Sequence, residues 1–243
     1  MDRFYYGSCD RISPEAPVPV LKFSRVEEMP GMAANVTENV KAFTDHVDLI
    51  CQEERITKSR FIDEKTKQHI LRFDEDARIA KSFDATNIDL SKYDIIILSD
   101  YDKGFLTADK ISNFTGTEGQ RFYVDTKKTN LSFFKNAILK INEKERTLID
   151  ETSIPETSEI LTTLGAGGAA WDGIKYATSA VDIFDVSGAG DTFLVAFSVF
   201  HHLTSDPAAS IKFANKCSRI VVQMPGTQPL DAKFFITDHL EEN

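Results

Sequence analysis

The sequence predicts an α/β protein built around a mostly parallel β-sheet with helices on both faces. Short apolar runs that end in polar or glycine residues alternate with segments of helical periodicity, a pattern typical of parallel sheets. Continuous apolar runs are expected for strands that are buried on both faces. At 243 residues, the chain is long enough to bury a sizeable core. The runs that we interpret as strands are 94–99, 121–125, 137–142 and 159–165.

Polar or glycine residues stand at the ends of all four predicted strands. In open α/β sheets, ligands bind beyond the carboxyl ends of the strands. We therefore expect Asp100, Asp125, Asn142 and Gly165 to lie in one shared crevice.

Two helices and a separate β segment complete the predicted elements. Residues 192–202 are apolar nearly all round, which indicates a buried helix, and residues 208–223 have the pattern of an amphipathic helix. The segment 5–26 combines several prolines with Val, Leu and Phe. Because proline cannot donate to a sheet ladder, we expect this segment to form edge β structure rather than a central strand.

The composition argues against several classes of protein. A net charge of −10 disfavours a nucleic-acid groove, because phosphate backbones are bound by concentrated Lys and Arg. Cys9, Cys51 and Cys217 form no C-x-x-C pair, which is typical of reduced thiols in a cytosolic protein. No apolar run approaches the roughly 18 residues of a membrane span, and the N-terminus lacks a signal-peptide core. We therefore expect a cytoplasmic protein with no membrane partner.

The segment 185–193 has the layout of a tight loop that leads into a buried helix. Gly188, Ala189 and Gly190 allow close backbone approach to a ligand, and N–H groups at a helix N-terminus favour an anion. A carboxylate at Asp191 would repel a phosphate, but it suits a base that deprotonates a hydroxyl attacking that phosphate. A glycine-rich turn with an N-capping acid explains the same residues about equally well.

This loop, with its flanking small and apolar residues, resembles the second signature of the ribokinase (PfkB) family of sugar kinases. Other segments are similar to the heptose 7-phosphate kinases of that family, and they occur in the family's order. These segments are 2–7, 11–20, 30–36 and 99–104. The resemblance extends, with a gap, from Asp2 to about Thr227.

The resemblance implies a ribokinase-like three-layer α/β/α fold with a small β lid. The lid strands would lie within 4–27 and 56–74, and the core would comprise 28–55 and 75–243. In this family the lids of two subunits often clasp each other, so the resemblance also suggests a homodimer through the lid.

The resemblance further implies ATP-dependent phosphorylation of a sugar phosphate. The acceptor would be the anomeric hydroxyl of D-glycero-D-manno-heptose 7-phosphate, and the product would be the 1,7-bisphosphate. Asp191 would be the general base, and the N–H groups of Gly188, Ala189 and Gly190 would bind the transferred phosphoryl group. A family member acting on another sugar, and a non-catalytic relative that binds nucleotide or sugar, are the alternative hypotheses.

Other motifs are similar to the family's elements for Mg²⁺ and for ATP. Asn142 and Glu145 match an Asn-x-x-Glu element that organises Mg²⁺ through water, although such a pair is also common at solvated helix starts. Lys127 resembles the lysine of an Asp-Pro-Lys element, with Thr126 in place of the proline. The remaining nucleotide positions implied by the resemblance are Thr163, Gly165, Gly168 and Asn215, and a plain packed helix explains Asn215 nearly as well.

Gly165, Gly167 and Ala170 also fit the dinucleotide-binding fingerprint. That motif has to open a helix, whereas residues 171–173 predict a hairpin turn. We therefore do not interpret this segment as a dinucleotide site.

On the acceptor side, the resemblance implies that Asp2, Gly31 and Asn35 contact the sugar hydroxyls. A distal phosphate on the sugar requires cations directed at it. For each available cation, a surface salt bridge is the more common explanation. The candidates are Arg11, Lys58, Arg60, Arg72 and Lys103, with Asp100 in the same motif as Lys103.

Three features depart from the family's pattern. The chain begins where the first central strand of the family has already ended, which predicts a gap in the sheet. Residues 47–51 run almost directly into 56–58, which indicates a deletion. Met32 replaces the second glycine of the sugar-binding pair, so its Cβ would crowd the sugar or change the backbone. No His-x-Gly-His nucleotidyl-transfer motif is present, and we expect a stand-alone kinase.

Overall fold

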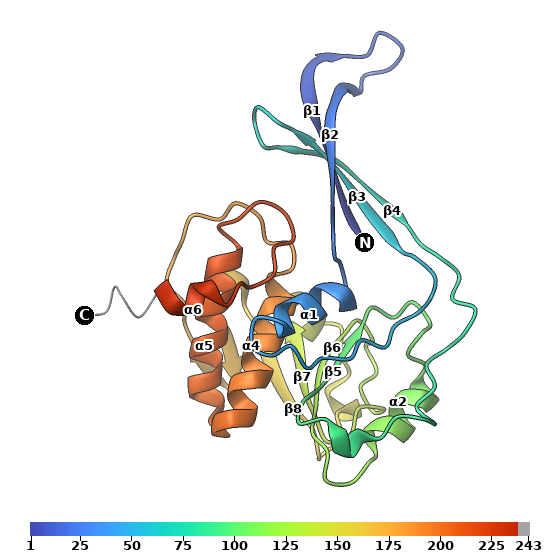
Figure 1. Cartoon of the computed structure of the whole chain (residues 1–243), viewed down its shortest axis with the longest axis vertical. Helices are drawn as coiled ribbons and strands as arrows, with labels where there is room; N and C mark the ends of the chain where they lie inside the picture. Colours follow the sequence, from blue (N-terminus) through green and yellow to red (C-terminus); the bar gives the residue numbers. More distant parts are fainter. Residues whose placement is uncertain (238–243) are drawn as a thin grey trace.

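The protein folds into a body containing six strands and a four-stranded sheet that projects from it (Figure 1). The structure is a computed structural model, and it describes residues 1–237. None of the helices in this part of the chain is long and apolar enough to cross a membrane.

The larger sheet has the strand order β10-β9-β8-β7-β6-β5. Strands β5 to β8 are parallel, and β8, β9 and β10 pair antiparallel. The predicted mostly parallel sheet is therefore confirmed, and the observed bounds of its parallel strands lie within two residues of the expected ones. The strands are β5 (Ile96–Asp100), β6 (Phe122–Thr126), β7 (Ala137–Asn142), β8 (Glu159–Thr163), β9 (Ala169–Trp171) and β10 (Ile174–Tyr176).

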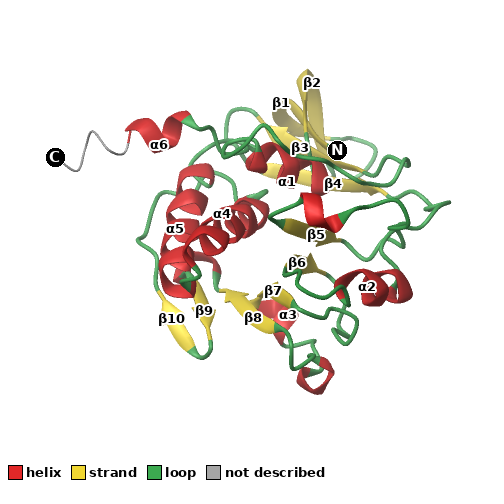
Figure 2. Cartoon of the chain, turned by 60° about the horizontal axis from the view of Figure 1, so that its bottom comes forward, coloured by secondary structure: helices red, strands yellow, loops and turns green. Residues whose placement is uncertain are grey.

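Helices cover both faces of this sheet, with α4 and α5 on one side and α2 on the other (Figure 2). Successive residues of β6 point to opposite faces: Tyr123 packs in the core cluster with α4 and α5, whereas Phe122 and Val124 pack with α2. This alternation produces the three layers that the sequence predicts. The helices are α1 (Ala33–Val40), α2 (Ala108–Thr115), α3 (Glu143–Arg146), α4 (Ala189–Thr204), α5 (Pro207–Val221) and α6 (Lys233–Thr237), with 3-10 turns at Leu90–Lys92, Glu151–Ser153 and Gly165–Gly167.

The smaller sheet has the order β2-β1-β3-β4, with β1 parallel to β3 and antiparallel to β2. The expectation of edge structure for residues 5–26 was therefore wrong for β1, which has a partner on each side. Pro14 and Pro17 lie in the connection after β1, and Pro19 is the first residue of β2, so the prolines do not interrupt the inner strand. The strands are β1 (Asp2–Ile12), β2 (Pro19–Met29), β3 (Thr57–Asp63) and β4 (His69–Glu75).

Strand β5 pairs with β6 only, so within residues 1–237 its other edge has no partner strand. A cavity of about 940 Å³ extends along this edge and reaches the end of β5 at Asp100. Apolar side chains of α1, β5 and the irregular connection 41–56 line it, among them Val36, Val40, Ile95 and Ile97. The described strands of the body form one continuous sheet, so the predicted gap between strands is not found; the sheet instead ends at the unpaired edge of β5.

Candidate active site

The glycine-rich loop leads directly into α4, as the sequence predicts, and the helix begins three residues earlier than expected. Gly188 is the residue before the first helical turn, with φ 80°. A Cβ at Gly188 would lie 2.8 Å from Asn35 Nδ2 and 2.8 Å from Thr227 Cγ2, so this position requires glycine. Ala189 and Gly190 form the start of the helix, and the Ala189 N–H makes only a long 3.3 Å contact with the carbonyl oxygen of Val186. The helix N-terminus therefore remains suited to an anion.

Asp191 lies in the first turn of α4 and is 6% exposed. Its Oδ2 accepts a 2.7 Å hydrogen bond from Asn35 Nδ2, and no side-chain hydrogen bond caps the helix. The alternative of an N-capping acid is therefore not supported. Burial raises the pKa of Asp191 to about 6, against the opposing hydrogen bond from Asn35. A carboxyl group with a pKa near neutral pH suits general base catalysis.

Asn39, which the sequence reading missed, connects the two helices that carry this pair. It is fully buried one turn after Asn35 in α1, and its Nδ2 donates to the Asn35 carbonyl oxygen at 2.8 Å. Its Oδ1 accepts from Thr192 Oγ1 at 2.8 Å and from the Leu230 N–H at 3.1 Å. The asparagines at i and i+4 on one helix face were the available sequence signal.

Asp2, Gly31 and Arg60 come together at the junction of the small sheet and the body. The Asp2 carboxylate is 6% exposed and accepts from Arg60 Nη1 at 2.8 Å and from Thr227 Oγ1 at 3.1 Å. A Cβ at Gly31 would lie 2.8 Å from Asp2 Oδ2. The guanidinium of Arg60 is thus held by a buried ion pair.

Met32 adopts a backbone conformation that strongly favours glycine, with φ 58° and ψ −136°. The sequence predicts that the Cβ of Met32 would crowd the sugar or change the backbone. The structure shows that the backbone keeps a positive φ at Met32 despite the Cβ. Residues held in such regions cost on the order of 1–3 kcal/mol each. The loop before α1 is therefore strained at the place where the resemblance locates the sugar.

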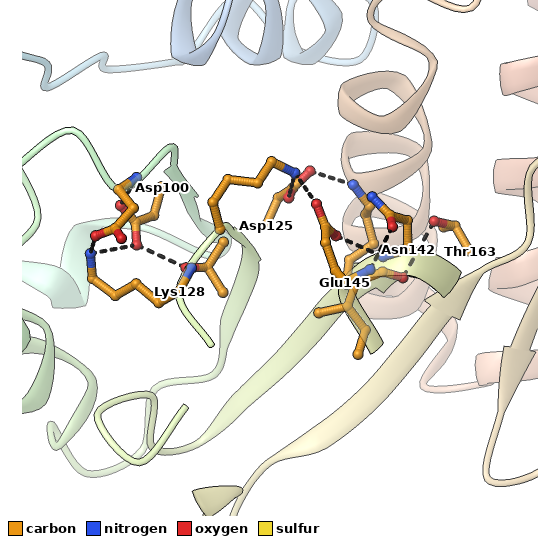
Figure 3. A network of polar contacts seen from close by, with 11 residues as sticks. Asp100, Asp125, Lys128, Asn142, Glu145 and Thr163 are labelled. Atoms are coloured by element: carbon orange, nitrogen blue, oxygen red, sulfur yellow. Dashed lines mark hydrogen bonds and ion pairs between the residues drawn. The ribbon is translucent and has the colours of Figure 1, made fainter. Parts of the chain in front are cut away.

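The carboxylate of Asp100 at the end of β5 is engaged by its neighbours. Its Oδ2 accepts from Thr126 Oγ1 at 2.8 Å and lies 3.3 Å from Lys128 Nζ (Figure 3). Its Oδ1 accepts from the Asp102 N–H at 3.0 Å. The exposed Lys103 instead pairs with Asp76 at 2.7 Å. Both oxygens of the Asp100 carboxylate therefore already have partners within the protein.

A chain of alternating charges crosses the ends of β6 and β7. The side chain of Lys140 is 5% exposed, and its Nζ forms an ion pair with Asp125. Lys127 Nζ contacts both Asp125, at 3.4 Å, and Glu145. Although burial alone would raise it, the pKa of Asp125 is lowered by the charges of Lys140 and Lys127. A Cβ at Gly190 would lie 3.0 Å from Lys140 Nζ, so this buried cation lies directly beside the anion loop.

Asn142 and Glu145 form a reciprocal capping box at the start of α3 (Figure 3). Asn142 Oδ1 accepts from the Glu145 N–H at 2.9 Å, and Glu145 Oε2 accepts from the Asn142 N–H at 2.8 Å. Within residues 1–237, no group of three or more His, Cys, Asp or Glu residues could hold a metal ion directly. One carboxylate and one amide oxygen, both oriented by the box, fit a Mg²⁺ ion that keeps most of its water ligands.

The predicted nucleotide residues lie at the end of β8 and on α5. Thr163 Oγ1 makes a long 3.4 Å contact with the Ile141 carbonyl oxygen, and Gly165 and Gly168 have φ 55° and 90°. The Asn215 amide donates to the Tyr176 carbonyl oxygen at 3.2 Å and so ties α5 to β10. This hydrogen bond agrees with the packed-helix explanation of Asn215, and its contact with the nucleotide stays a prediction.

The dinucleotide fingerprint opens onto a hairpin, as the sequence predicts. Strands β9 and β10 pair antiparallel, and the two connecting residues, Asp172 and Gly173, have φ 47° and 75°. Two positive φ values are typical of a type I′ hairpin turn. The 3-10 turn at Gly165–Gly167 is too short to provide the long helix that a dinucleotide site requires.

The predicted phosphate-binding cations do not all reach this site. Arg11 is exposed near the distal end of β1, nine residues along the strand from Asp2, which corresponds to about 30 Å. The exposed Arg72 is paired with Asp74 at 2.6 Å, and in register it lies opposite Arg60 on the small sheet. Lys58 is half-buried in β3. The small sheet therefore brings Lys58, Arg60 and Arg72 together but leaves Arg11 apart.

The matching family and the relatives agree with the sequence motifs. Residues 125–233 match the model of the pfkB family carbohydrate kinases. The bifunctional protein HldE of Gluconacetobacter diazotrophicus is 29% identical over 293 residues, covering 95% of this chain and 60% of that protein. The HldE protein of Rhodopseudomonas palustris is 30% identical over 288 residues, covering 93% and 59%. The resemblance to this family is therefore confirmed.

This chain spans about 60% of the length of these curated relatives. Because 95% of 243 residues is about 231, roughly 62 of the 293 aligned positions have no counterpart here. This difference agrees with the deletion that the junction between residues 51 and 56 indicates.

Solved structures show the same fold at low sequence identity. Ribokinase from Thermotoga maritima superposes with a TM-score of 0.69 at 15% identity, covering 100% of this chain and 97% of that chain. Phosphofructokinase-2 from Escherichia coli in complex with substrates and products gives a TM-score of 0.70 at 14% identity, covering 96% and 92%. The predicted ribokinase-like fold is thus confirmed.

Proposed function

We propose that this chain, a relative of the pfkB family carbohydrate kinases, transfers the γ-phosphoryl group of ATP to a hydroxyl group of a sugar. The observation that carries the proposal is the placement of Asp191. It is a buried carboxyl group with a raised pKa, one residue beyond a glycine-rich loop at a helix N-terminus. A base and an anion site are thereby adjacent, as phosphoryl transfer to a hydroxyl requires.

In this mechanism Asp191 accepts the proton of the acceptor hydroxyl as its oxygen attacks the γ-phosphorus. The bond between that phosphorus and the bridging oxygen breaks, and ADP leaves. The loop N–H groups of Gly188 and Gly190 stabilise the charge on the transferred group, and Asn35 orients the base. Lys140 lies beside Gly190 and adds positive charge beneath the same loop.

ATP and Mg²⁺ are the cofactors of the proposed reaction. Thr163, Gly165 and Gly168 would border the nucleotide, and Lys127 would approach its phosphates. Asn142 and Glu145 would hold Mg²⁺ through its water ligands. The bound metal would neutralise charge on the phosphates. One of the structurally similar proteins, a ribokinase from Cryptococcus neoformans, was solved in complex with ADP.

We propose a heptose 7-phosphate as the acceptor, phosphorylated at its anomeric hydroxyl. The support is the motif resemblance together with the similarity to HldE proteins over more than nine-tenths of this chain. Asp2, Gly31 and Asn35 border the acceptor side, and Lys58 and Arg72 are the lid cations best placed for a sugar phosphate. Arg60 is less suited to that role, because it is already paired with buried Asp2.

The conformation of Met32 favours a second candidate function, which is action on a different sugar or binding without turnover. Met32 carries a side chain where the loop conformation favours glycine, next to the residues expected to contact the sugar. A reshaped loop at this point alters the space available to the acceptor.

We also propose a homodimer through the small sheet. Several large apolar side chains on its strands are exposed, as expected for an interface. They are Ile12, Phe23, Val26, Leu71 and Phe73.

The test is ADP release from Mg-ATP, measured with D-glycero-D-manno-heptose 7-phosphate, ribose, fructose and no sugar. Heptose-dependent release that falls by about 10²–10⁴-fold in Asp191→Asn, with ATP affinity retained, supports the proposal. ADP release that depends on ribose or fructose instead would show that the acceptor is a different sugar. ATP binding without ADP release for any sugar would support the non-catalytic alternative.

A further inference from the structure

Asn39 lies one helical turn after Asn35 on the same face of α1, and it is fully buried. Its Nδ2 donates to the Asn35 carbonyl oxygen at 2.8 Å and, over a longer 3.4 Å, to Asn35 Oδ1. Its Oδ1 accepts from Thr192 Oγ1 and from the Leu230 N–H. Both polar atoms of the Asn39 amide therefore have partners, and these partners come from α1, α4 and the segment between α5 and α6.

The contact between the two asparagines matches only one orientation of the Asn35 amide. An asparagine amide has a donating nitrogen and an accepting oxygen, which exchange places when the amide rotates by half a turn. The Asn35 nitrogen donates to Asp191 Oδ2 at 2.7 Å, and the Asn35 oxygen faces the Asn39 donor. The rotated amide would direct its oxygen at the Asp191 carboxylate, where two acceptors repel each other, and its nitrogen at the Asn39 donor.

The orientation of Asn39 is fixed in turn by donors on its other side. The Leu230 N–H can only donate, so it requires the oxygen of the Asn39 amide, which leaves the nitrogen toward Asn35. Thr192 Oγ1 donates to the same oxygen, and Thr192 directly follows Asp191 in α4. The hydrogen bonds thus form a closed circuit that leaves α4 beside the base, passes through both asparagines and returns to the base.

We propose that Asn39 is a positioning residue that holds the Asn35 amide with its nitrogen directed at the base, Asp191. This inference rests on the proposed function, because it concerns the base of that reaction. Burial raises the pKa of Asp191, and the hydrogen bond from Asn35 opposes this rise by favouring the ionised carboxylate. If Asn39 no longer holds Asn35, that hydrogen bond weakens and the pKa of Asp191 rises further.

The other ionisable groups around Asp191 come from the ends of β-strands. After burial and the hydrogen bond that it accepts, Lys140 of β7 lowers the pKa of Asp191, whereas Asp125 of β6 and Asp2 of β1 raise it. Burial and then the charge of Asp191 raise the pKa of Tyr101, which follows β5. Replacing Asn39 leaves all of these side chains in place, so a change in the pKa of Asp191 reports the hydrogen bond itself.

The experiment measures the pKa of the Asp191 carboxyl group by carboxyl-carbon NMR titration, with Asp191→Asn to assign the resonance. Asn35→Ala removes a hydrogen bond to a charged group and should raise this pKa by about one pH unit. Asn39→Ala should raise it in the same direction, by roughly half as much. The double variant Asn35→Ala/Asn39→Ala should not exceed Asn35→Ala, because Asn39 acts through Asn35.

Thr192→Val tests the same circuit without altering either asparagine. Valine keeps the shape of threonine but cannot donate to Asn39 Oδ1, so the pKa of Asp191 should rise by a smaller step than in Asn39→Ala. Thr115→Val is the matched control, because Thr115 is equally buried and its hydroxyl donates to backbone carbonyl oxygens of α2 and the β6–β7 connection instead. This control should leave the pKa of Asp191 unchanged.

Thermal unfolding shows which variants are folded, and the acid limb of kcat/KM for the sugar should move with the pKa. An unchanged pKa of Asp191 in folded Asn39→Ala would overturn the positioning role. A further increase in the double variant, or equal increases in Thr192→Val and Thr115→Val, would also overturn it. The titration does not depend on turnover. Absence of ADP release from the wild type with every sugar would therefore overturn the proposed function, while the titration would still report whether Asn39 orients Asn35.

Discussion

The amide of Asn35 donates a 2.7 Å hydrogen bond to the carboxylate of Asp191, although 156 residues separate the two in the chain. Asn35 belongs to α1, which follows the lid strand β2, whereas Asp191 lies in the first turn of α4. The bond fixes the orientation of the proposed base relative to the acceptor side.

The kcat/KM for the sugar should depend on pH, with an acid limb near pH 6. Burial raises the pKa of Asp191 to about 6, and a general base has to be ionised to accept a proton. Because kcat/KM reports ionisation in the free enzyme, kcat/KM for the sugar should be constant above that value and fall about tenfold per pH unit below it. Initial rates of ADP release across this range check the prediction. An acid limb near pH 4 would mean that Asp191 ionises as an ordinary exposed carboxyl group.

Asp191→Asn should be more stable than the wild type at high pH. A raised pKa means that the folded state favours the protonated acid, so this contribution to stability is present below about pH 4 and is lost as pH rises through about 6. Asparagine carries no charge to bury, and we expect a gain of about 1–3 kcal/mol at pH 8. Urea unfolding at several pH values measures it. A difference that does not shrink toward pH 4 would rule out titration as its source.

Gly188→Ala should reduce turnover as well as stability. The new Cβ would lie 2.8 Å from Asn35 Nδ2, which displaces the donor of the hydrogen bond to Asp191. Gly173→Ala is a matched control, because Gly173 has a similar φ of 75° but no atom within 4 Å of the added Cβ. The control should cost about 1–2 kcal/mol through its backbone alone and leave turnover unchanged. Equal turnover in the two variants would contradict the role of Asn35.

Met32→Gly should stabilise the protein and change sugar affinity. Relief of the φ 58°, ψ −136° conformation is expected to yield about 1 kcal/mol, after the extra backbone entropy of glycine is subtracted. Lys67→Gly is the control, since Lys67 has φ 62° in the β3–β4 connection. Both variants should unfold at higher denaturant, but only Met32→Gly should change the KM for the sugar. An unchanged KM would separate the strained loop from the acceptor site.

Arg60 and Arg72 face each other in the lid but should respond differently to replacement. Arg60→Met removes the ion-pair partner of the buried Asp2 carboxylate, at an expected cost of about 3–5 kcal/mol. Arg72→Ala removes an exposed ion pair worth at most about 1 kcal/mol. It should raise the KM for a phosphorylated sugar more than for the unphosphorylated analogue. Equal KM changes for the two sugars would remove Arg72 from the phosphate site.

The parallel strands, the buried helix after the glycine-rich loop and the hairpin at residues 171–173 could be predicted from the sequence. Each depends on a local pattern: continuous apolar runs, glycines beside an apolar stretch, and a turn pair that tolerates positive φ. The inner position of β1 could not be predicted in this way. Its pairing with β3 depends on residues more than 50 positions away, and the prolines of the connection suggested an edge strand.

The sequence by itself determined where the glycine-rich loop and the candidate base lie in the chain, because motif spacing is a property of the chain alone. Only the tertiary structure decided which residues meet there. It buried Asp191 against Asn35, placed Lys140 beside Gly190, closed Asp2 onto Arg60 and left Arg11 at the far end of the lid. The pKa of a carboxyl group and the pairing of a cation depend on neighbours from distant segments, which are defined only when the chain folds.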